Sequence, residues 1–234
     1  YFHCSSDSHS LDGVLIPALK VTMVDGTAPH TIDPVYPGVV EEIVNLGEFW
    51  NTSALAGYKD KVFLGKKEIK FNFARAYRYL EAAAALYEDI KETNIKYTDY
   101  RKVKKLACDL VEELLSMSDT ENMPGKEGSE RRLFASAITP DGVVHHLDSI
   151  LNTNRIYGLV GEKGMGTDIV LEKVKEEALN SGYDVECFYC ALLPDKLEHL
   201  IIPELDISLT TMNKYHKTEL NIQKHFCFEE FVDK

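Results

Sequence analysis

The feature that most constrains this chain is an internal repeat. Residues 2–30 align without a gap with residues 188–216, at an offset of 186 residues. Seven positions are identical: Phe2/Phe188, Cys4/Cys190, Leu11/Leu197, Ile16/Ile202, Pro17/Pro203, Leu19/Leu205 and His30/His216. Conservative pairs, Asp12/Glu198 among them, lie between these identities. We expect a duplicated supersecondary unit; the alternative is two unrelated strand–helix–strand units that look alike because such units share a pattern.

The second copy belongs to a longer α/β pattern that begins upstream of it. This pattern predicts a buried strand, a glycine-rich loop, an amphipathic helix, a strand, a short helix and a third strand, over residues 156–160, 161–166, 167–180, 184–190, 194–200 and 206–211. The first copy shows only the later part, with strands at 1–4 and 20–24 and a short helix near 8–13. Such alternation predicts a parallel sheet with right-handed crossovers and helices on both faces.

A helical region separates the two copies. Apolar residues at helical spacing predict helices over 38–50, 67–91 and 99–116, the last two forming a helical hairpin. A strand over 133–138 and a helix over 142–151 follow. We therefore expect four parts, namely the rear of a first module, the helical region, a linker and a second module, over residues 1–37, 38–116, 117–131 and 132–234.

Composition excludes several classes of protein. The chain has 26 Lys and Arg against 38 Asp and Glu, a net charge of −12, which argues against a protein that coats nucleic acid. No apolar run reaches the roughly 18 residues of a membrane span. Five irregularly spaced cysteines favour a reducing compartment, so a cytoplasmic location is expected. Because Tyr1 already lies in a strand pattern, we expect that further sequence precedes it.

The glycine-rich loop lies between a predicted strand and a predicted helix, as a phosphate-binding loop requires. Its glycines allow backbone N–H groups to surround phosphate oxygens at a helix N-terminus. In the full pattern G-x-x-x-x-G-K-[ST], the lysine position here holds Thr167 and the hydroxyl position Asp168. Lys163 is the residue that would compensate; the alternative is a decayed loop that only turns the chain. The candidate nucleotide-binding residues are Gly161, Lys163, Gly164, Met165, Gly166, Thr167 and Asp168.

A second candidate is the apolar run Val21–Val24, which ends in Asp25 and Gly26. Such a strand resembles a Walker B strand, whose carboxylate positions Mg²⁺ directly or through water. Asp25 is therefore the candidate catalytic and Mg²⁺-binding residue, although Asp-Gly also forms turns. Its repeat partner is Thr211, so the second module lacks this acid as well as the loop lysine and hydroxyl.

Several motifs resemble an uncharacterised bacterial ATPase family that carries two tandem P-loop NTPase modules. They are His3–Asp7, Ser10–Pro17, Val24–His30, Asp33–Pro34, Pro37–Gly38 and Phe134–Gly142. The resemblance spans most of the chain. It implies nucleotide binding and ATP hydrolysis in the cytosol, with an intact lysine-containing loop upstream of the His-Cys-Ser-Ser motif. Asp25 would then serve a loop that lies ahead of Tyr1.

Other groups carry weaker expectations. Ser5, Ser6 and Asp7 follow a predicted parallel strand, where ligands bind in open α/β sheets, or else they cap a turn. His30 is a further candidate ligand contact. A metal site among His3, Cys4, His9 and His30 is disfavoured, because only His30 among the histidines has a repeat partner. Cys187 and Cys190 have redox spacing but are expected to be buried strand thiols.

These patterns lead to one functional expectation and one alternative. We expect a tandem P-loop protein that binds ATP and Mg²⁺ and hydrolyses ATP or transfers a phosphoryl group, with the module at 132–234 degenerate. The alternative is a non-enzymatic nucleotide sensor or scaffold. No membrane or nucleic-acid partner is expected, whereas a homo-oligomer or a protein partner would use the degenerate module.

Overall fold

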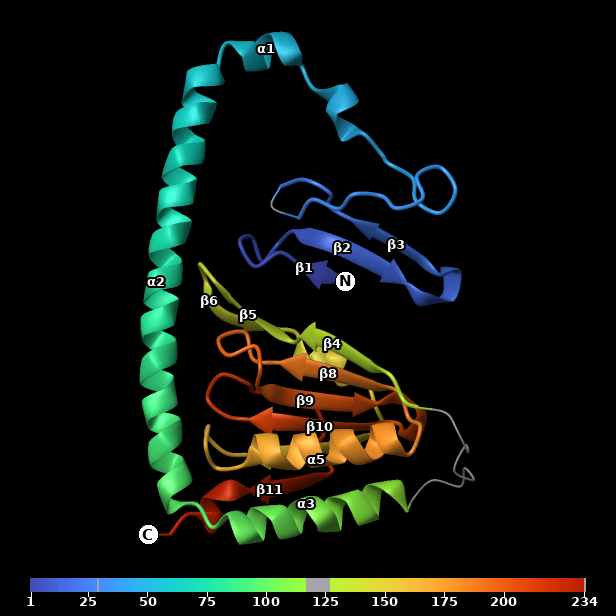
Figure 1. Cartoon of the computed structure of the whole chain (residues 1–234), viewed down its shortest axis with the longest axis vertical. Helices are drawn as coiled ribbons and strands as arrows, with labels where there is room; N and C mark the ends of the chain where they lie inside the picture. The colour runs from blue at the N-terminus through green and yellow to red at the C-terminus, as the bar shows by residue number, and fades with distance from the viewer. Residues whose placement is uncertain (29, 117–126, 234) are drawn as a thin grey trace. The chain divides into compact units, whose positions relative to one another are not determined.

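The computed structural model of the chain describes residues 1–28, 30–116 and 127–233, which form two compact units, Tyr1–Glu81 and Ala82–Lys234 (Figure 1). The division lies inside the long helix α2 (Lys59–Tyr97). Most of the expected linker, 117–131, lies outside the described residues, and its last two residues already belong to strand β4 (Glu130–Phe134).

The Tyr1–Glu81 unit contains a three-stranded antiparallel sheet in the order β1-β2-β3. Its strands are β1 (Phe2–His3), β2 (Leu11–Ile16) and β3 (Val21–Val24), followed by a 3₁₀ turn at Leu46–Phe49, the short helix α1 (Thr52–Ala56) and the start of α2. The helix expected near 8–13 is wrong, because the second half of that segment, residues 11–13, belongs to strand β2, which pairs with β1 and β3. The helix expected over 38–50 is also wrong, since only Leu46–Phe49 near its end is helical, and that segment is a 3₁₀ turn.

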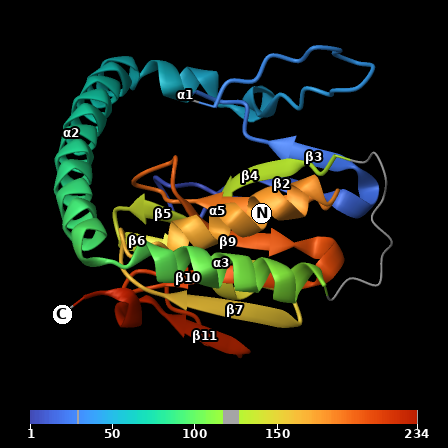
Figure 2. The same cartoon turned by 60° about the horizontal axis from the view of Figure 1, so that its bottom comes forward.

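The Ala82–Lys234 unit is built on a mixed six-stranded sheet in the order β11-β7-β10-β9-β8-β4, whose strands are labelled between Figure 1 and Figure 2. Besides β4, its strands are β7 (Arg155–Val160), β8 (Val185–Tyr189), β9 (Leu197–Ile202), β10 (Ile207–Met212) and β11 (Lys224–Cys227). β7 pairs in parallel with β10 and β11, and β4 in parallel with β8, whereas β9 runs antiparallel to both neighbours. An α/β architecture is confirmed, but a wholly parallel sheet is wrong.

The antiparallel strand β9 lies where a short helix over 194–200 was expected. All six of its residues are buried, so it lacks the alternation that marks a half-exposed strand. It reverses into β10 through the 3₁₀ turn Pro203–Leu205, after which Asp206 takes a left-handed conformation with φ of 54°. A tight reversal cannot join parallel strands, so β9 and β10 form a hairpin.

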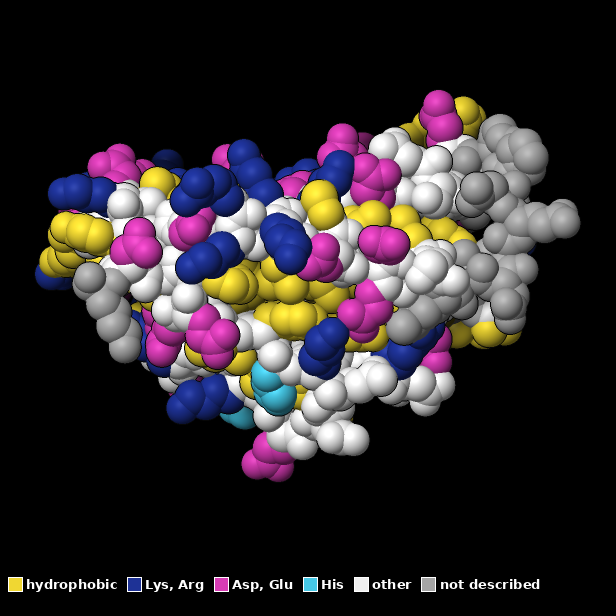
Figure 3. All heavy atoms as spheres, turned by 90° about the horizontal axis from the view of Figure 1, so that it is seen from below, with side chains coloured by type: hydrophobic (Ala, Val, Ile, Leu, Met, Phe, Trp, Pro, Cys, Tyr) yellow, Lys and Arg dark blue, Asp and Glu magenta, His cyan; other side chains and the backbone are white. Residues whose placement is uncertain are grey.

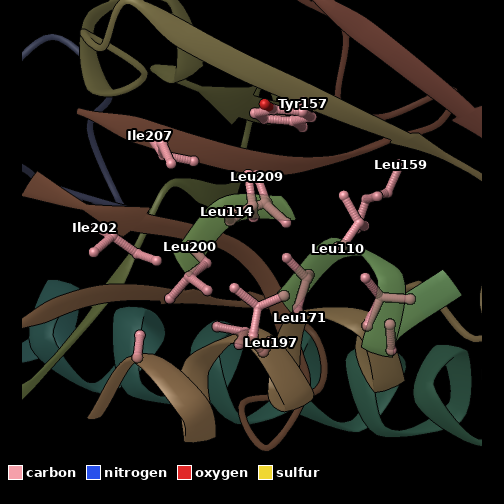
Figure 4. Packing of buried hydrophobic residues seen from close by; sticks show 14 of the residues in the cluster. Leu110, Leu114, Tyr157, Leu159, Leu171, Leu197, Leu200, Ile202, Ile207 and Leu209 are labelled. Atoms are coloured by element: carbon pink, nitrogen blue, oxygen red, sulfur yellow. The ribbon is translucent and has the colours of Figure 1, made fainter. Parts of the chain in front are cut away.

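Two helices, α3 (Tyr100–Leu115) and α5 (Thr167–Asn180), cover one face of this sheet, as expected from their apolar spacing. Figure 4 shows Leu110 and Leu114 of α3 and Leu171 of α5 packed against sheet residues such as Leu200 and Leu209. Burying each such side chain contributes about 1.5–3 kcal/mol. The expected hairpin of α2 with α3 is wrong, because α3 packs along α5 instead.

The opposite face of the sheet is covered by smaller elements. Strands β5 (Ser136–Thr139) and β6 (Gly142–His145) form a hairpin, and the single-turn helix α4 (Leu147–Ile150) follows. Leu147 and Leu151 pack there against Phe188 and Ile201. The helix expected over 142–151 is therefore half wrong, since its first part is strand β6.

The two repeat copies have the same local structure. β1, β2 and β3 correspond to β8, β9 and β10 at the offset of 186, with the same antiparallel order. A 3₁₀ turn beginning at proline joins the second and third strands in each copy, and Lys20 and Asp206 after it both have φ of 54°. The two stretches therefore share one backbone pattern, as the expected duplication requires.

On the face seen in Figure 3, Lys, Arg, Asp and Glu side chains are intermixed around a band of hydrophobic side chains. Among the described residues on this face, basic and acidic side chains alternate and do not form a surface of a single sign. Across the described ranges of the chain, none of the helices combines the length and the apolarity needed to span a bilayer.

Candidate functional site

The glycine-rich loop connects β7 to α5, at the edge where β7 and its parallel neighbour β10 both end. The N–H of Gly161 donates to the carbonyl of Met212, which ties the loop to the end of β10. Gly164 and Gly166 have φ of +85° and +98°, values that side-chain-bearing residues rarely adopt. The loop therefore turns directly into the N-terminus of α5, as its sequence predicts.

The loop borders a small cleft of about 20 Å³, enough for roughly one water molecule. Its lining combines glycines of the loop with three lysines and two acids, and includes Lys91, Lys163, Lys196, Asp168, Glu198 and Thr211. The lysines have acidic partners: Lys196 Nζ is 3.6 Å from Asp168 Oδ2, and Lys91 Nζ contacts Glu88. The cleft thus carries paired charges of both signs, and at about 20 Å³ it is too small for a nucleotide in this conformation.

Lys163, which lines this cleft, is largely buried. Its Nζ lies 3.4 Å from Oε1 of Glu198, and the two side chains are only 12% and 7% exposed. The ammonium group also lies 5.4 Å from the ring centroid of Tyr87, whose hydroxyl pKa is raised by burial. Lys163 therefore pairs with a carboxylate on the sheet.

Helices α2 and α3 close over the loop. Asn94 Nδ2 donates to the carbonyl of Lys163 at 2.7 Å, and the Tyr100 hydroxyl donates to that of Gly164 at 2.5 Å. A Cβ on Gly164 would lie 2.4 Å from the carbonyl oxygen of Lys91, and one on Gly166 would lie 2.7 Å from Val103. The glycines thus serve close packing as well as the turn.

The remaining loop candidates have structural contacts. Met165 packs against the core, and its Sδ accepts from the N–H of Glu162. Thr167 is buried in the first turn of α5, and Asp168 beside it pairs with Lys196. Neither Thr167 nor Asp168 supplies the lysine ammonium that neutralises phosphate in the full pattern.

A buried polar cluster that the sequence did not predict lies beside the loop. Glu198, His199 and His216 place ligand-type atoms within 4.8 Å of one another. Burial holds the pKa of His199 well below the ordinary histidine value, and burial also lowers that of His216. His145 lies near them, with its ring centroid 6.1 Å from that of His216. The repeat could have pointed to this cluster, because Glu198 and His216 align with Asp12 and His30, a carboxylate and a histidine, in the first copy.

The other predicted site residues lie in the Tyr1–Glu81 unit. Ser5, Ser6 and Asp7 belong to the connection between the antiparallel strands β1 and β2, so their placement after a parallel strand is wrong. Asp7 accepts there from the N–H of His9, as a turn residue does. His30 Nε2 lies 3.6 Å from Oδ2 of Asp12.

Asp25 directly follows β3, as predicted. Its Oδ1 accepts from both the N–H and the hydroxyl of Thr27, at 2.8 Å each, and these bonds hold the pKa of the carboxyl below its ordinary value. An ionised carboxylate is what a Mg²⁺ partner requires, but the same bonds are those of an Asx turn. Asp25 and the loop at 161–166 belong to different compact units.

The cysteines at redox spacing are buried thiols, as expected. Cys187 lies in β8 and Cys190 directly after it; both are buried and free. Burial raises the pKa of Cys187 to about 12 and also raises that of Cys190. Neither thiol is set up as a nucleophile.

In comparisons with known proteins, no protein-family model, no curated protein and no solved structure matches the chain.

Proposed function

We propose that the Ala82–Lys234 unit is a phosphate-loop module of the P-loop type that interacts weakly with nucleotide phosphates and does not hydrolyse ATP. The strand–glycine loop–helix geometry at 160–167 carries this proposal. Two glycines at positive φ start α5, whose N-terminus favours anions. Lys91, Lys163 and Lys196 converge on the same cleft.

Weak binding follows from the side chains around the loop. Asp168 places a negative charge in the first turn of α5 and engages Lys196, which would otherwise be free for phosphate. The cleft must also open, since about 20 Å³ holds no triphosphate. Hydrolysis is not expected here because Thr167 and Thr211 replace the lysine and the acid that handle phosphate and Mg²⁺ charge.

In the larger scheme that we propose, ATP and Mg²⁺ bind at an intact loop of a tandem protein, with Asp25 ordering the metal. The module at 132–234 is then regulatory. The duplicated hairpin supports this scheme, because it places Asp25 and Thr211 at equivalent positions after β3 and within β10. A protein of this kind would be a cytoplasmic ATPase with one active and one degenerate module.

A scaffold role is the second candidate, and the closure of the loop by α2 and α3 favours it. Asn94 and Tyr100 donate to two loop carbonyls, so the loop fastens these helices to the sheet. In this alternative no phosphate ligand is involved.

Calorimetric titration of the 234-residue chain with ATP, ADP and pyrophosphate, with and without Mg²⁺, separates the two. We expect a millimolar Kd for the chain. The variant Asp168→Ser should bind about tenfold more tightly, because it removes the negative charge and frees Lys196 for phosphate. A tenfold change in Kd corresponds to about 1.4 kcal/mol of binding free energy. Asp195→Ser is the matched control, since Asp195 is an exposed acid next to Lys196 and does not line the cleft. If neither the chain nor Asp168→Ser binds any of these ligands, the scaffold reading stands. Phosphate release abolished by Asp168→Ala would contradict a non-hydrolytic module.

A further inference from the structure

Three side chains beside the loop bring metal-ligand atoms together in the protein interior. Glu198 and His199 are the second and third residues of β9, and His216 lies in the segment after β10. Their exposed fractions are 5%, 0% and 5%. Side chains of this type are rarely buried without a partner, so the cluster calls for a physical explanation.

An irregularity in the sheet allows two neighbouring residues to take part. The pairing of β8 with β9 shifts between Phe188 and Tyr189, which pair with His199 and Leu197, so Glu198 has no residue opposite it. A residue inserted in this way breaks the alternation of side chains. Glu198 can therefore lie on the same side as His199, and its Oε2 is 3.7 Å from Nε2 of His216.

Several polar atoms of the cluster have no hydrogen-bond partner among the described residues. They include Oε2 of Glu198, Nε2 of His199 and Nδ1 of His216. His199 is oriented by its other nitrogen, since Nδ1 lies 2.7 Å from the hydroxyl of Thr210. Metal-binding histidines are commonly held in this way, with one ring nitrogen fixed and the other presented to the ion.

We propose that Glu198, His199 and His216 bind one divalent transition-metal ion, with Zn²⁺ the best match. Two imidazoles and one carboxylate are a typical zinc ligand set, with a fourth position left to water. Ligand atoms around tetrahedral zinc lie roughly 3.4 Å apart, given bonds of about 2.0–2.2 Å. The ligand atoms of the three side chains lie within 4.8 Å of one another, and small side-chain rotations would bring them to the zinc spacing.

The surroundings fit the remaining parts of such a site. The cleft that Glu198 and Thr211 line has room for about one water molecule, which would be the fourth ligand. Lys163 holds the other carboxylate oxygen, Oε1, at 3.4 Å and leaves Oε2 for the ion. This proposal does not depend on phosphate binding at the loop.

The repeat supplies an internal control. In the first copy Asp12 and His30 form the equivalent carboxylate–histidine pair, but Gly13 stands where His199 stands in the second copy. The first copy therefore lacks the third ligand, and we expect no comparable site there.

The test uses the full chain stripped with a chelator and then titrated with Zn²⁺ by calorimetry, with the bound metal counted by mass spectrometry. We expect one ion per chain, a loss of affinity of roughly 100-fold or more in His199→Gln and in His216→Gln, and no change in His30→Gln. X-ray absorption of the Zn²⁺-loaded wild-type chain should show imidazole and oxygen ligands without sulfur, a result that does not depend on variants folding. Absence of binding, sulfur ligation, or full affinity in a folded His199→Gln variant would overturn the proposal.

Discussion

Nε2 of His216 lies 3.7 Å from Oε2 of Glu198, and the same two repeat positions form a pair 186 residues earlier, where His30 Nε2 lies 3.6 Å from Asp12 Oδ2. In both copies the carboxylate sits at an interruption of strand pairing, and the histidine follows the third strand. The duplication therefore preserves a side-chain interaction as well as a backbone path. The copies differ in burial, since the first pair is partly exposed.

This difference in burial gives a matched prediction on stability. Ile202 is fully buried against α3, α5 and the sheet, whereas its repeat partner Ile16 is 39% exposed. We expect Ile202→Ala to lower the free energy of unfolding by about 2–4 kcal/mol, because it leaves a cavity, and Ile16→Ala to lower it by less than about 1 kcal/mol. Urea titration followed by circular dichroism, with peptide-resolved hydrogen exchange to assign each loss to its unit, measures both. Equal losses would show that the two sheets are equally covered.

Much of the second module could be predicted from its sequence, because there the local signals agree with tertiary packing. The helix at 167–180 has apolar residues at helical spacing, with glycines before it at Gly166 and after it at Gly182. The strand at 156–160 is a short apolar run beside a glycine loop, and it is β7. The predicted strand and the predicted helix together also locate the glycine-rich loop between them.

The antiparallel strand β9 could not be predicted in the same way. Its sequence, from Leu197 to Ile202, is buried on both faces and has no period of two. The buried cluster of Glu198, His199 and His216 could not be predicted for a related reason. Consecutive strand residues such as Glu198 and His199 are expected on opposite faces of the sheet unless the pairing register shifts. Register shifts depend on the partner strand, which local sequence does not identify.

The buried pair of Lys163 and Glu198 gives a second prediction. Lys163→Met leaves the carboxylate buried without its cation, and we expect a loss of about 3 kcal/mol or more in the free energy of unfolding. Adding Glu198→Gln should restore part of this loss. Lys196→Met is the matched control: Lys196 also pairs with an acid, but both side chains are about one-third exposed, so a loss below about 1 kcal/mol is expected. Denaturant titration of the three variants and the wild-type chain measures these losses, and a similar small loss for both lysines would mean that the buried pair contributes little.

Thiol reactivity gives a prediction with a defined pH dependence. Only the thiolate is alkylated, and with a pKa of about 12 the Cys187 thiol stays protonated at pH 9, whereas Cys108 is exposed. We expect iodoacetamide to modify Cys108 readily at pH 8.5–9 and to leave Cys187 unmodified until the chain unfolds, as read by peptide mass spectrometry. Because the unfolded thiol ionises near 8.5 and the folded one does not, this group lowers stability as the pH rises above that value. Rapid modification of Cys187 in the folded chain would contradict its burial.

The closure of the glycine loop gives the last prediction. Gly164 has φ of +85°, and an added Cβ would meet the backbone oxygen of Lys91, which cannot move without displacing α2. We expect Gly164→Ala to lower the free energy of unfolding by about 2 kcal/mol or more and to raise hydrogen exchange at the C-terminal end of α2 and in the loop. Gly26→Ala is the control, since a Cβ there meets nothing within 4 Å, and its effect should be close to zero. If Gly164→Ala keeps wild-type exchange in Lys91–Tyr97, the loop does not hold α2 in place, and the scaffold role loses its structural basis.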